Sequence, residues 1–388
     1  MPGARAASRF DPLGALLTAL AGIAVLALPF VLFKANRIMP GVPRGLVESA
    51  GWTWGVAAYG MLTCAGAVAL WVRSPRWRLV VALVGTVIVA LAVAAAAQHL
   101  TPEGNRVVRV APGGAFWIVL FALGLLATDA LTRLALRPSA KVLWLAVTLG
   151  VALLALHTGY FDDLSVMREY VVNASRFARE ARQHVVLALG SLAAEVVIAV
   201  PLGVACHRRP AFGAAMLGLL NFVQTVPSIA LFGILMAPLA ALAVAFPALA
   251  ALGVSGIGTA PAIVALFLYS LLPIVANTVV GLTRVSPAAV DAARGMGMTE
   301  SEVLRQVKFP LALPTILTGL RIVLVQNIGL ATIAALIGGG GLGAFVFQGI
   351  GQTAIDLVLL GAIPTVTLAF TASVVLDALT DLTRRVSR

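Results

Sequence analysis

Charged residues are scarce in this chain of 388 residues. Asp, Glu, Lys and Arg make up 11% of the sequence, whereas 61% is hydrophobic and the mean hydropathy is +1.03. A soluble core of this size has no room for so much apolar surface. The composition therefore excludes an ordinary soluble globular protein and indicates a polytopic membrane protein.

Cysteine is almost absent, and histidine is rare. Cys64 and Cys206 fall in two separate apolar runs, so a disulfide framework or a cysteine-based metal site has no basis. The histidines lie far apart near the ends of apolar runs, where we expect interfacial residues: His99, His157, His184 and His207. We therefore expect no metal site and no catalytic residues on this chain.

A nucleotide-binding lysine is also missing. The three lysines are Lys34, Lys141 and Lys308, and none follows the glycine of a Gly-x-x-x-x-Gly-Lys-Ser/Thr loop. The run from Gly338 to Gly343 fits the formula Gly-x-Gly-x-x-Gly, but it follows an apolar run and precedes no βαβ unit. We therefore expect a chain that is not an enzyme and carries no cofactor. A separate subunit that binds ATP and Mg²⁺, or an ion gradient, would supply the energy.

Long apolar runs are what the chain does contain. Each is long enough to cross roughly 30 Å of hydrocarbon as a helix. The runs cover about 13–33, 54–72, 79–97, 115–135, 142–158, 185–206, 213–237, 260–282, 315–337 and 355–378. We predict an all-α membrane protein with about ten transmembrane helices and no open strands, because unpaired strand edges cannot lie in lipid.

A net charge of +12 could indicate a protein that binds nucleic acid. The positions of the basic residues argue against that function, because they follow the membrane topology and form no basic domain. Lys and Arg alternate from loop to loop. With the loop around residues 284–314 placed in the cytoplasm, 18 lie on that side and nine on the other. This bias predicts that both termini are cytoplasmic. Arg5 and Arg9 precede a first run that is too long for a signal peptide, so we expect it to be retained.

The chain divides at a change of composition. Residues 159–182 mix Asp162, Asp163, Glu169 and Glu180 with several arginines. We interpret this segment as an extracytoplasmic connector, either plain solvated surface or a contact for a soluble binding protein. It separates residues 1–158, an accessory region of about five helices, from residues 183–383. The uncharged stretch 238–259 either re-enters the membrane or lies on the outer surface.

Residues 287–314 form a long polar interruption in the second half. Ser286 and Pro287 suit the N-cap and first position of a helix, which Gly295 and Gly297 end. Thr299 and Glu302 form a capping box for a second helix, with Val303, Leu304 and Val307 on one apolar face. We expect Pro310 and Pro314 to close the unit and to return the chain to the bilayer. Taken alone, this pattern also fits an ordinary cytoplasmic loop.

The spacing within this interruption is more specific. It resembles the EAA signature of bacterial ABC-importer membrane subunits, with Asp for Glu and Phe309 for Leu. The resemblance implies a type I ABC-importer transmembrane fold, a coupling loop at 284–314 and a separate ATP-binding subunit that this loop contacts. The residues implied in coupling are Asp291, Ala292, Ala293, Gly297, Glu302, Val307 and Pro310.

Further motifs narrow the resemblance. QTVPS from Gln224, FLYSLLPIVANT from Phe267 and AALIGGGGLG from Ala334 occur in the expected order within residues 183–383. They resemble the osmoprotectant permeases, whose members import glycine betaine, choline or carnitine, and the long N-terminal extension resembles the Yeh-type subset. This implies a bacterial inner-membrane location, a second permease subunit (the same chain or another) and an extracytoplasmic solute-binding protein. Few of the aromatic residues that a quaternary ammonium cage needs lie in the matching region. Substrate choice is therefore expected to reside in the binding protein.

Polar residues inside spans are candidates for the translocation path. Glu195 lies in the middle of an apolar run, where a carboxyl group is costly unless it meets a partner, water or substrate. A helix-packing role and a path role are both open for it. The weaker candidates are Gln224, Thr225, Ser228 and Asn277. A glycine-rich hinge or gate at the outer end of the path is expected from Gly338, Gly339, Gly340, Gly341 and Gly343.

Two other functions compete with an ATP-driven importer. An ion-gradient-driven secondary transporter would use Glu195 as its coupling carboxylate, but it favours an inverted internal repeat, and the two halves share none that we detect. A membrane-embedded enzyme would need clustered His, Asp or Glu within spans, and no such cluster is present in the sequence.

Overall fold

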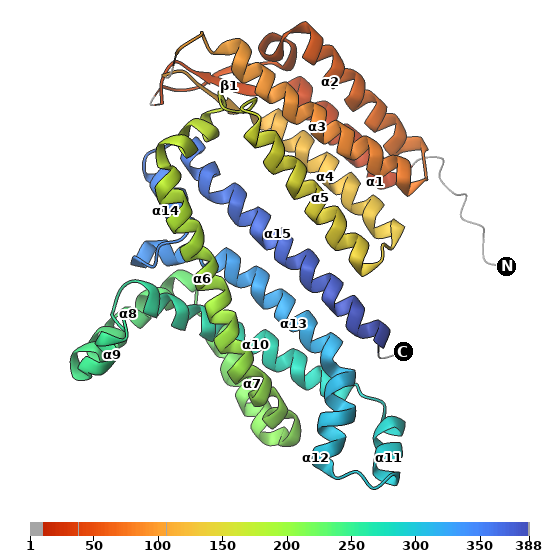
Figure 1. Cartoon of the computed structure of the whole chain (residues 1–388), viewed down its shortest axis with the longest axis vertical. Coiled ribbons are helices and arrows are strands. Elements are labelled where there is room, and N and C mark those ends of the chain that lie inside the picture. The colour runs from red at the N-terminus through yellow and green to blue at the C-terminus, as the bar shows by residue number, and fades with distance from the viewer. Residues whose placement is uncertain (1–10, 38, 106, 387–388) are drawn as a thin grey trace, which may run out of the picture. The chain divides into compact units, whose positions relative to one another are not determined.

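The computed structural model describes residues 11–37, 39–105 and 107–386 (Figure 1). The chain splits into two compact units. The first comprises Met1–Leu136 and Val147–Val172, and the second comprises Arg137–Ala146 and Asn173–Arg388. The basic residues Arg5, Arg9, Arg106 and Arg388, which entered the charge count, lie outside the described residues.

The first unit is built mainly from helices that pack through small side chains. Its elements are α1 (Pro12–Ala27), β1 (Val31–Lys34), β2 (Val42–Arg44), α2 (Leu46–Trp71), α3 (Pro75–Leu100), β3 (Arg109–Pro112), α4 (Gly114–Leu134) and part of α5 (Pro138–His157). The central helix α3 contacts both α2 and α4. Ala92, Ala94 and Ala96 of α3 are fully buried, because a methyl side chain lets neighbouring backbones approach closely.

A small antiparallel sheet corrects the expectation that strands are excluded. Its order is β2-β1-β3, with Val31 opposite Arg44 on one side and Pro112 on the other. The strands occupy the segments between apolar helices, and the central strand β1 is paired along both of its edges. Unpaired backbone groups of a strand are excluded only from the hydrocarbon of a membrane, so a strand in a segment between spans is allowed. The predicted first span 13–33 accordingly ends at Ala27, and its last residues form β1.

A buried ion cluster ties four helices of the first unit together. The Arg78 side chain is 1% exposed and donates to the carbonyl oxygens of Val72 and Ala69 at 2.8 and 2.9 Å. Its guanidinium also pairs with Asp11, the N-cap of α1, and with Asp129 of α4 at 3.2 Å. Arg133 pairs with the same two carboxylates. Each buried charge therefore has partners, which is the condition for burying it without a large penalty.

The second unit holds the remaining helices, although the first of them begins in the first unit and enters the second at Asn173. They are α6 (Ser165–Arg208), α7 (Pro210–Thr225), α8 (Ser228–Ala245), α9 (Pro247–Ala251), α10 (Thr259–Thr283), α11 (Pro287–Gly295), α12 (Glu300–Glu302), the π-helical η1 (Val303–Lys308), α13 (Phe309–Leu330), the 3₁₀-helix η2 (Ile333–Ile337), α14 (Gly343–Gly351) and α15 (Ile355–Val386). Helix α13 lies between α10 and α15 and contacts both (Figure 1). It therefore occupies the centre of this unit.

The prediction of an all-α membrane protein with about ten spans is confirmed in outline. Among the described residues, nine helices are long and apolar enough to cross a membrane, and α1 is a shorter apolar helix of 16 residues. The predicted connector 159–182 contains a turn at Gly159 and then the first part of α6. It is therefore continuous with the span that follows it.

Two further predicted spans have the wrong boundaries. The run 213–237 is broken into α7 and α8 at Val226 and Pro227, because proline lacks an N–H and disfavours a helical conformation in the preceding residue. Helix α8 then continues to Ala245, so the stretch 238–259 begins as helix and ends in the short α9 and a loop. The run 315–337 leaves the α-helix after Leu330 and finishes as the 3₁₀-helix η2.

Candidate functional site

The coupling segment, residues 284–314, folds largely as its local chemistry dictates. Pro287 is the first residue of α11, although the side chain of the N-cap Ser286 makes no capping hydrogen bond. Thr299 and Glu302 form the predicted capping box, in which the Thr299 N–H donates to the Glu302 carboxylate at 2.7 Å. Gly297 has a φ of +83°, in the left-handed region, with open space around the position of a Cβ. Glycine is therefore required there for its backbone conformation and not for close packing.

The two arms of the segment share a small apolar core. Val290 and Ala293 of α11 and Val303 of η1 are buried against one another, with Val285, Met298 and Val307 packed around them. Leu304 points elsewhere and packs with Phe309 against α10 and α13. Figure 1 shows α11 beside α12 at one end of the second unit. The segment is thus a preformed helical hairpin with its own core.

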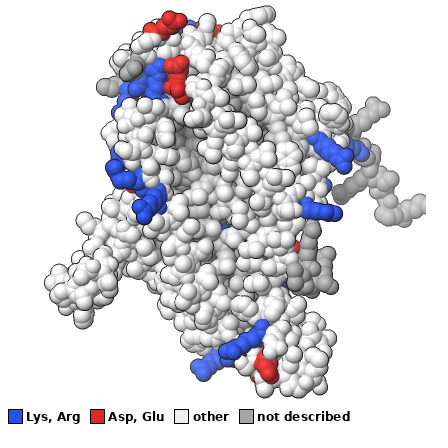
Figure 2. Space-filling view, in the orientation of Figure 1, with Lys and Arg blue, Asp and Glu red and all other residues white. Residues whose placement is uncertain are grey.

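The opposite face of the hairpin is exposed. The Asp291 side chain is 72% exposed, Ala292 is exposed, and Met296 is 73% exposed. Arg294 donates to Glu300 at 2.8 Å and lies 3.8 Å from Asp291, and the hydrogen bond and charge of Glu300 raise the pKa of Arg294. Figure 2 shows blue and red surface gathered at this end of the second unit. The exposed face of the hairpin therefore carries an apolar methionine as well as charged side chains.

Pro310 and Pro314 do not turn the chain, which corrects the prediction. One continuous helix runs from Glu300 to Leu330, with Pro314 inside it. The turn before Pro310 is π-helical, and the Phe309 N–H bonds to the Leu304 carbonyl five residues earlier. The wider π turn makes room for the proline ring, which would clash in a regular α-turn. The coupling segment is therefore joined to α13 by continuous helix.

Glu195 lies in a buried polar cluster with Ser191, Ser270 and Asn327, all of them 0% exposed. The Asn327 amide donates to both Glu195 carboxylate oxygens, at 3.0 and 3.1 Å, and to the Ser191 hydroxyl at 3.0 Å. Its carbonyl oxygen accepts from the Ser270 hydroxyl at 2.6 Å. These contacts join α6, α10 and α13. In this conformation they favour the helix-packing role of Glu195, and its role in a path stays a prediction.

Three of the weaker path candidates lie at the break between α7 and α8. Gln224 is half-buried and donates to the Tyr269 carbonyl at 2.7 Å, and the Tyr269 hydroxyl donates to the carbonyl of Val226. Both bonds support the break between α7 and α8. Thr225 is exposed, and its hydroxyl donates to the Phe222 carbonyl at 2.7 Å. Ser228 begins α8.

Asn277 lies on the next helix, α10. Its amide donates to the Pro273 carbonyl at 2.8 Å, and its Cβ faces Gly319 of α13. This bond stays within α10. The carbonyl that Pro273 leaves without a helical N–H donor is that of Tyr269, four residues earlier, and it accepts from the Gln224 amide. A role of Asn277 in the path stays a prediction.

The glycine-rich loop is held by the N-terminal half of α6. Gly338, Gly340 and Gly341 have positive φ, and a Cβ on Gly343 would lie 1.9 Å from the Thr332 carbonyl oxygen. The Gly341 N–H donates to the Glu180 carboxylate at 2.8 Å. The Gln183 amide donates to the carbonyl of Gly339 at 3.0 Å.

These contacts give Glu180 and Gln183 a part in the site that the sequence did not indicate. In the sequence, these two residues are marked only as polar side chains close to the start of the predicted span 185–206. Asn327 was also missed, although an amide in the middle of a span is a signal of the same kind as Glu195. The described residues contain no group of three or more His, Cys, Asp or Glu side chains suited to a metal ion.

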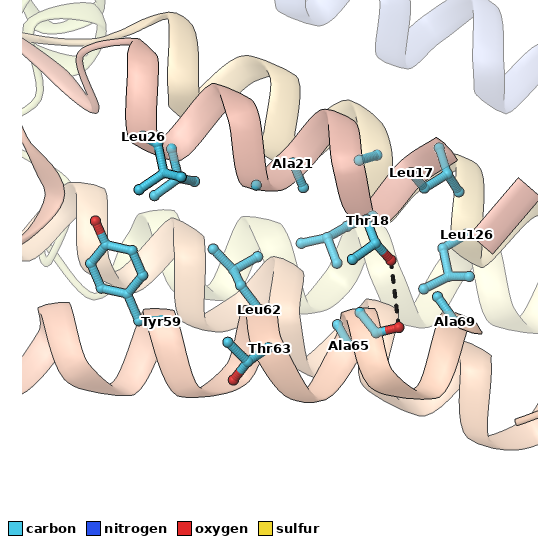
Figure 3. A pocket seen from close by; sticks show the side chains of 15 residues that line it. Leu17, Thr18, Ala21, Leu26, Tyr59, Leu62, Thr63, Ala65, Ala69 and Leu126 are labelled. Carbon is cyan, nitrogen blue, oxygen red and sulfur yellow. Dashed lines mark hydrogen bonds between the residues drawn. The ribbon is translucent and has the colours of Figure 1, made fainter. Parts of the chain in front are cut away.

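An apolar crevice of about 250 Å³ lies in the first unit between α1, α2 and α4 (Figure 3). Leu17, Leu62 and Leu126 line it, and Tyr59 lies at one end. The Thr18 hydroxyl donates to the backbone carbonyls of Gly14 at 2.8 Å and Gly66 at 3.4 Å, and is therefore already paired. The lining suits an apolar group and offers a charged solute few partners.

Comparisons with known families cover both parts of the chain. Residues 11–167 match the model described as "ABC transporter permease YehY, N-terminal domain", and residues 196–386 match "Binding-protein-dependent transport system inner membrane component". The inward-facing MetNI methionine ABC transporter aligns with 53% of this chain and 95% of its own, at 22% identity and a TM-score of 0.46.

Curated relatives match the second part of the chain. The glycine betaine/carnitine/choline transport system permease protein OpuCB of Bacillus subtilis is 37% identical over 213 residues, which cover 55% of this chain and 89% of the relative. The osmoprotectant import permease protein OsmW of Salmonella typhimurium is 43% identical over 191 residues, covering 49% and 84%. The chain is therefore a multi-pass membrane protein of the permease family whose members are the inner membrane components of binding-protein-dependent transport systems.

Proposed function

We propose that this permease imports an osmoprotectant of the glycine betaine, choline or carnitine class. The observation that carries the proposal is the similarity of residues in the second unit to relatives with those substrates in their names. Such solutes bear a fixed positive charge on a quaternary ammonium group. Their recognition usually needs an aromatic cage, so we propose that a separate extracytoplasmic binding protein selects the solute and delivers it.

The energy would come from a separate subunit that binds ATP and Mg²⁺. The preformed hairpin of the coupling segment supports this part of the proposal, because it exposes Met296 and Asp291 and is continuous with α13. A movement imposed on the hairpin would pass along a single helix to the centre of the second unit. Two copies of the permease, or this chain with a second permease, would form the path, with both termini in the cytoplasm.

The test is assembly followed by ATP hydrolysis. The full chain, copurified with its ATP-binding subunit, should hydrolyse ATP faster when the binding protein and choline, glycine betaine or carnitine are added. Asp291→Lys should weaken assembly, because it reverses an exposed charge on the docking face. Normal assembly and stimulated hydrolysis in both Asp291→Lys and Gly297→Val would show that the segment does not dock the ATPase.

A further inference from the structure

An open groove of about 590 Å³ lies beside the coupling segment, between the end of α6 and the start of the helix that leads into α13. Its lining residues are His207, Arg208, Glu300, Ser301, Leu304 and Lys308. This set contains two cationic side chains, Arg208 and Lys308, with an imidazole and a hydroxyl, but only one carboxylate. The composition therefore favours an anionic occupant.

A chain of hydrogen bonds fixes one wall of the groove. The Thr283 hydroxyl donates to the Val279 carbonyl at 2.8 Å, so its oxygen is free to accept from Nδ1–H of His207 at 3.2 Å. The other ring nitrogen, Nε2, then accepts from the Lys308 ammonium at 3.4 Å. This contact uses one of the three N–H donors of Lys308. The imidazole is thus held in one tautomer, and the ammonium is held at the groove.

The opposite wall adds little negative charge. Glu300 lines the groove, but its carboxylate accepts from Arg294 Nε at 2.8 Å. That ion pair neutralises much of the charge that Glu300 would present to an incoming anion. Arg208 is exposed, and Leu304 offers an apolar surface for methylene groups. The lining therefore matches a carboxylate on a short aliphatic stem.

We propose that this groove receives a carboxylate side chain of the ATP-binding subunit, as a second contact beside the coupling hairpin. The proposal rests on the proposed function, in which that subunit docks on the hairpin. Continuity of the surface supports it, because Arg294 of α11 pairs with Glu300 of the groove wall. A subunit that covers α11 therefore meets the groove across this ion pair.

The position of the groove favours a protein group over a lipid headgroup. Glu300 and Ser301 lie about 15 Å along the helix axis before Pro310, where the apolar part of the helix begins. A phospholipid phosphate would reach Lys308 but not the first turn of this helix. A subunit docked on the hairpin covers that first turn and would bring an acidic residue to Lys308 and Arg208 from this side.

Charge reversal in the full chain tests the proposal. Wild type, Arg208→Glu and Lys308→Glu are placed in nanodiscs of phosphatidylcholine, and their affinity for the ATP-binding subunit is measured at several salt concentrations. We expect each variant to bind about tenfold more weakly at low salt, with a smaller salt dependence than the wild type. Arg209→Glu is the matched control, because Arg209 is an exposed cation outside the coupling segment that does not line the groove. It should bind within about twofold of the wild type.

A conservative variant and a thermal unfolding measurement keep the result interpretable. Lys308→Arg keeps the charge and should bind like the wild type, and all variants should unfold at similar temperatures. Wild-type affinity in both charge-reversal variants would overturn the groove proposal. The proposed function would still stand if Asp291→Lys and Gly297→Val lose binding in the same assay. If the defect arises only in nanodiscs with added phosphatidylglycerol, the groove binds an anionic lipid and the proposed assignment is wrong.

Discussion

At the scale of single residues, buried polar groups are bound to specific partners on other helices. The cluster around Glu195 illustrates this, since the Asn327 amide is oriented by acceptors at one end and by the Ser270 hydroxyl at the other. The sequence indicates Glu195 because a carboxyl group in an apolar run is unusual. Its partner lies 132 residues away, and no local pattern pairs the two.

Substitutions at Glu195 separate packing from charge. Glu195→Gln keeps the shape and an oxygen that accepts from Asn327, so we expect nearly wild-type stability and uptake. Glu195→Leu leaves the Asn327 amide without that acceptor and should cost about 1–3 kcal/mol of stability. Thermal unfolding in detergent and solute uptake are measured together. Loss of uptake in Glu195→Gln, with the ATPase still docked and active, would instead place the carboxylate in the path.

The buried Arg78 should dominate the stability of the first unit. Arg78→Met removes the charge that pairs with Asp11 and Asp129, and we expect a loss of about 3–5 kcal/mol, the usual cost of breaking a buried pair. Arg76→Met is the control, because Arg76 is exposed on the same helix. Equal unfolding temperatures for the two variants would contradict the account of this cluster.

The same cluster predicts a response to acid. Partial burial raises the pKa of Asp11, but the hydrogen bond and charge of Arg78 and the N–H groups of Gly14 and Leu13 lower it further, so the net pKa is below 3.8. When the pKa of a carboxyl group is lower in the folded state than in the unfolded state, the group stabilises the fold at pH values above its unfolded-state pKa. This stability is lost as the pH falls through the folded-state pKa. The unfolding temperature should therefore drop below about pH 4. The Asp11→Asn variant should show a smaller drop, and an unchanged pH profile would refute this assignment.

At the scale of elements, the coupling segment is where local chemistry predicts most. Pro287, the capping box at Thr299 and the positive φ of Gly297 all follow from short-range rules. The breaks that the sequence analysis misplaced depend on context. Apolar composition continues through Val226–Pro227, and short-range rules give Pro310 the same helix-breaking character as Pro227. These rules do not show that Pro227 follows a helix end whereas Pro310 is accommodated beside a π turn.

Gly297 gives the sharpest test of this element. Gly297→Val forces a branched side chain into a left-handed conformation, which costs at least about 1 kcal/mol, and we expect weaker assembly with the ATP-binding subunit. Gly295→Ala is the matched control, since Gly295 ends α11 without positive φ and has open space beside it. The coupling account fails here if both variants assemble equally well.

The glycine-rich loop makes a comparable prediction at the other end of α6. Gly341→Ala places a methyl group about 3.1 Å from His184 Nδ1 at a φ of +87°, so both backbone strain and crowding oppose it. We expect lower stability and slower uptake, with docking of the ATPase unchanged because the coupling segment is intact. Gly233→Ala, in open space on α8, is the control. Full uptake by Gly341→Ala would remove the hinge or gate role.

At the scale of the whole molecule, the division of the chain differs from the predicted accessory region 1–158. Residues 137–146, the start of α5, belong to the second unit, where Lys141 pairs with Asp377 at 2.7 Å and with Asp381 at 2.8 Å. Arg321 of α13 also pairs with Asp377. The helical class and the approximate number of spans follow from composition and run length. The ion pairs of Lys141 and Arg321 with Asp377 do not follow from composition, because they depend on which helices lie next to each other.

Two shortened chains test the assignment of α5. A chain that starts at Arg137 keeps Lys141, whereas one that starts at residue 160 with an added leader loses it. We expect the first to be more stable in detergent. If both insert, unfold at the same temperature and transport at the full rate, then residues 1–158 are dispensable and the start of α5 contributes nothing.

The central claim is that a docked ATPase drives solute import through this permease. The most direct measurement is uptake of labelled choline, glycine betaine and carnitine into proteoliposomes that contain the chain, its ATP-binding subunit and the binding protein. ATP is supplied on the side of the ATPase, without an ion gradient. The account predicts uptake of at least one of these solutes that requires ATP and is lost in Asp291→Lys. Uptake driven by a proton or sodium gradient in vesicles without any ATPase would contradict it.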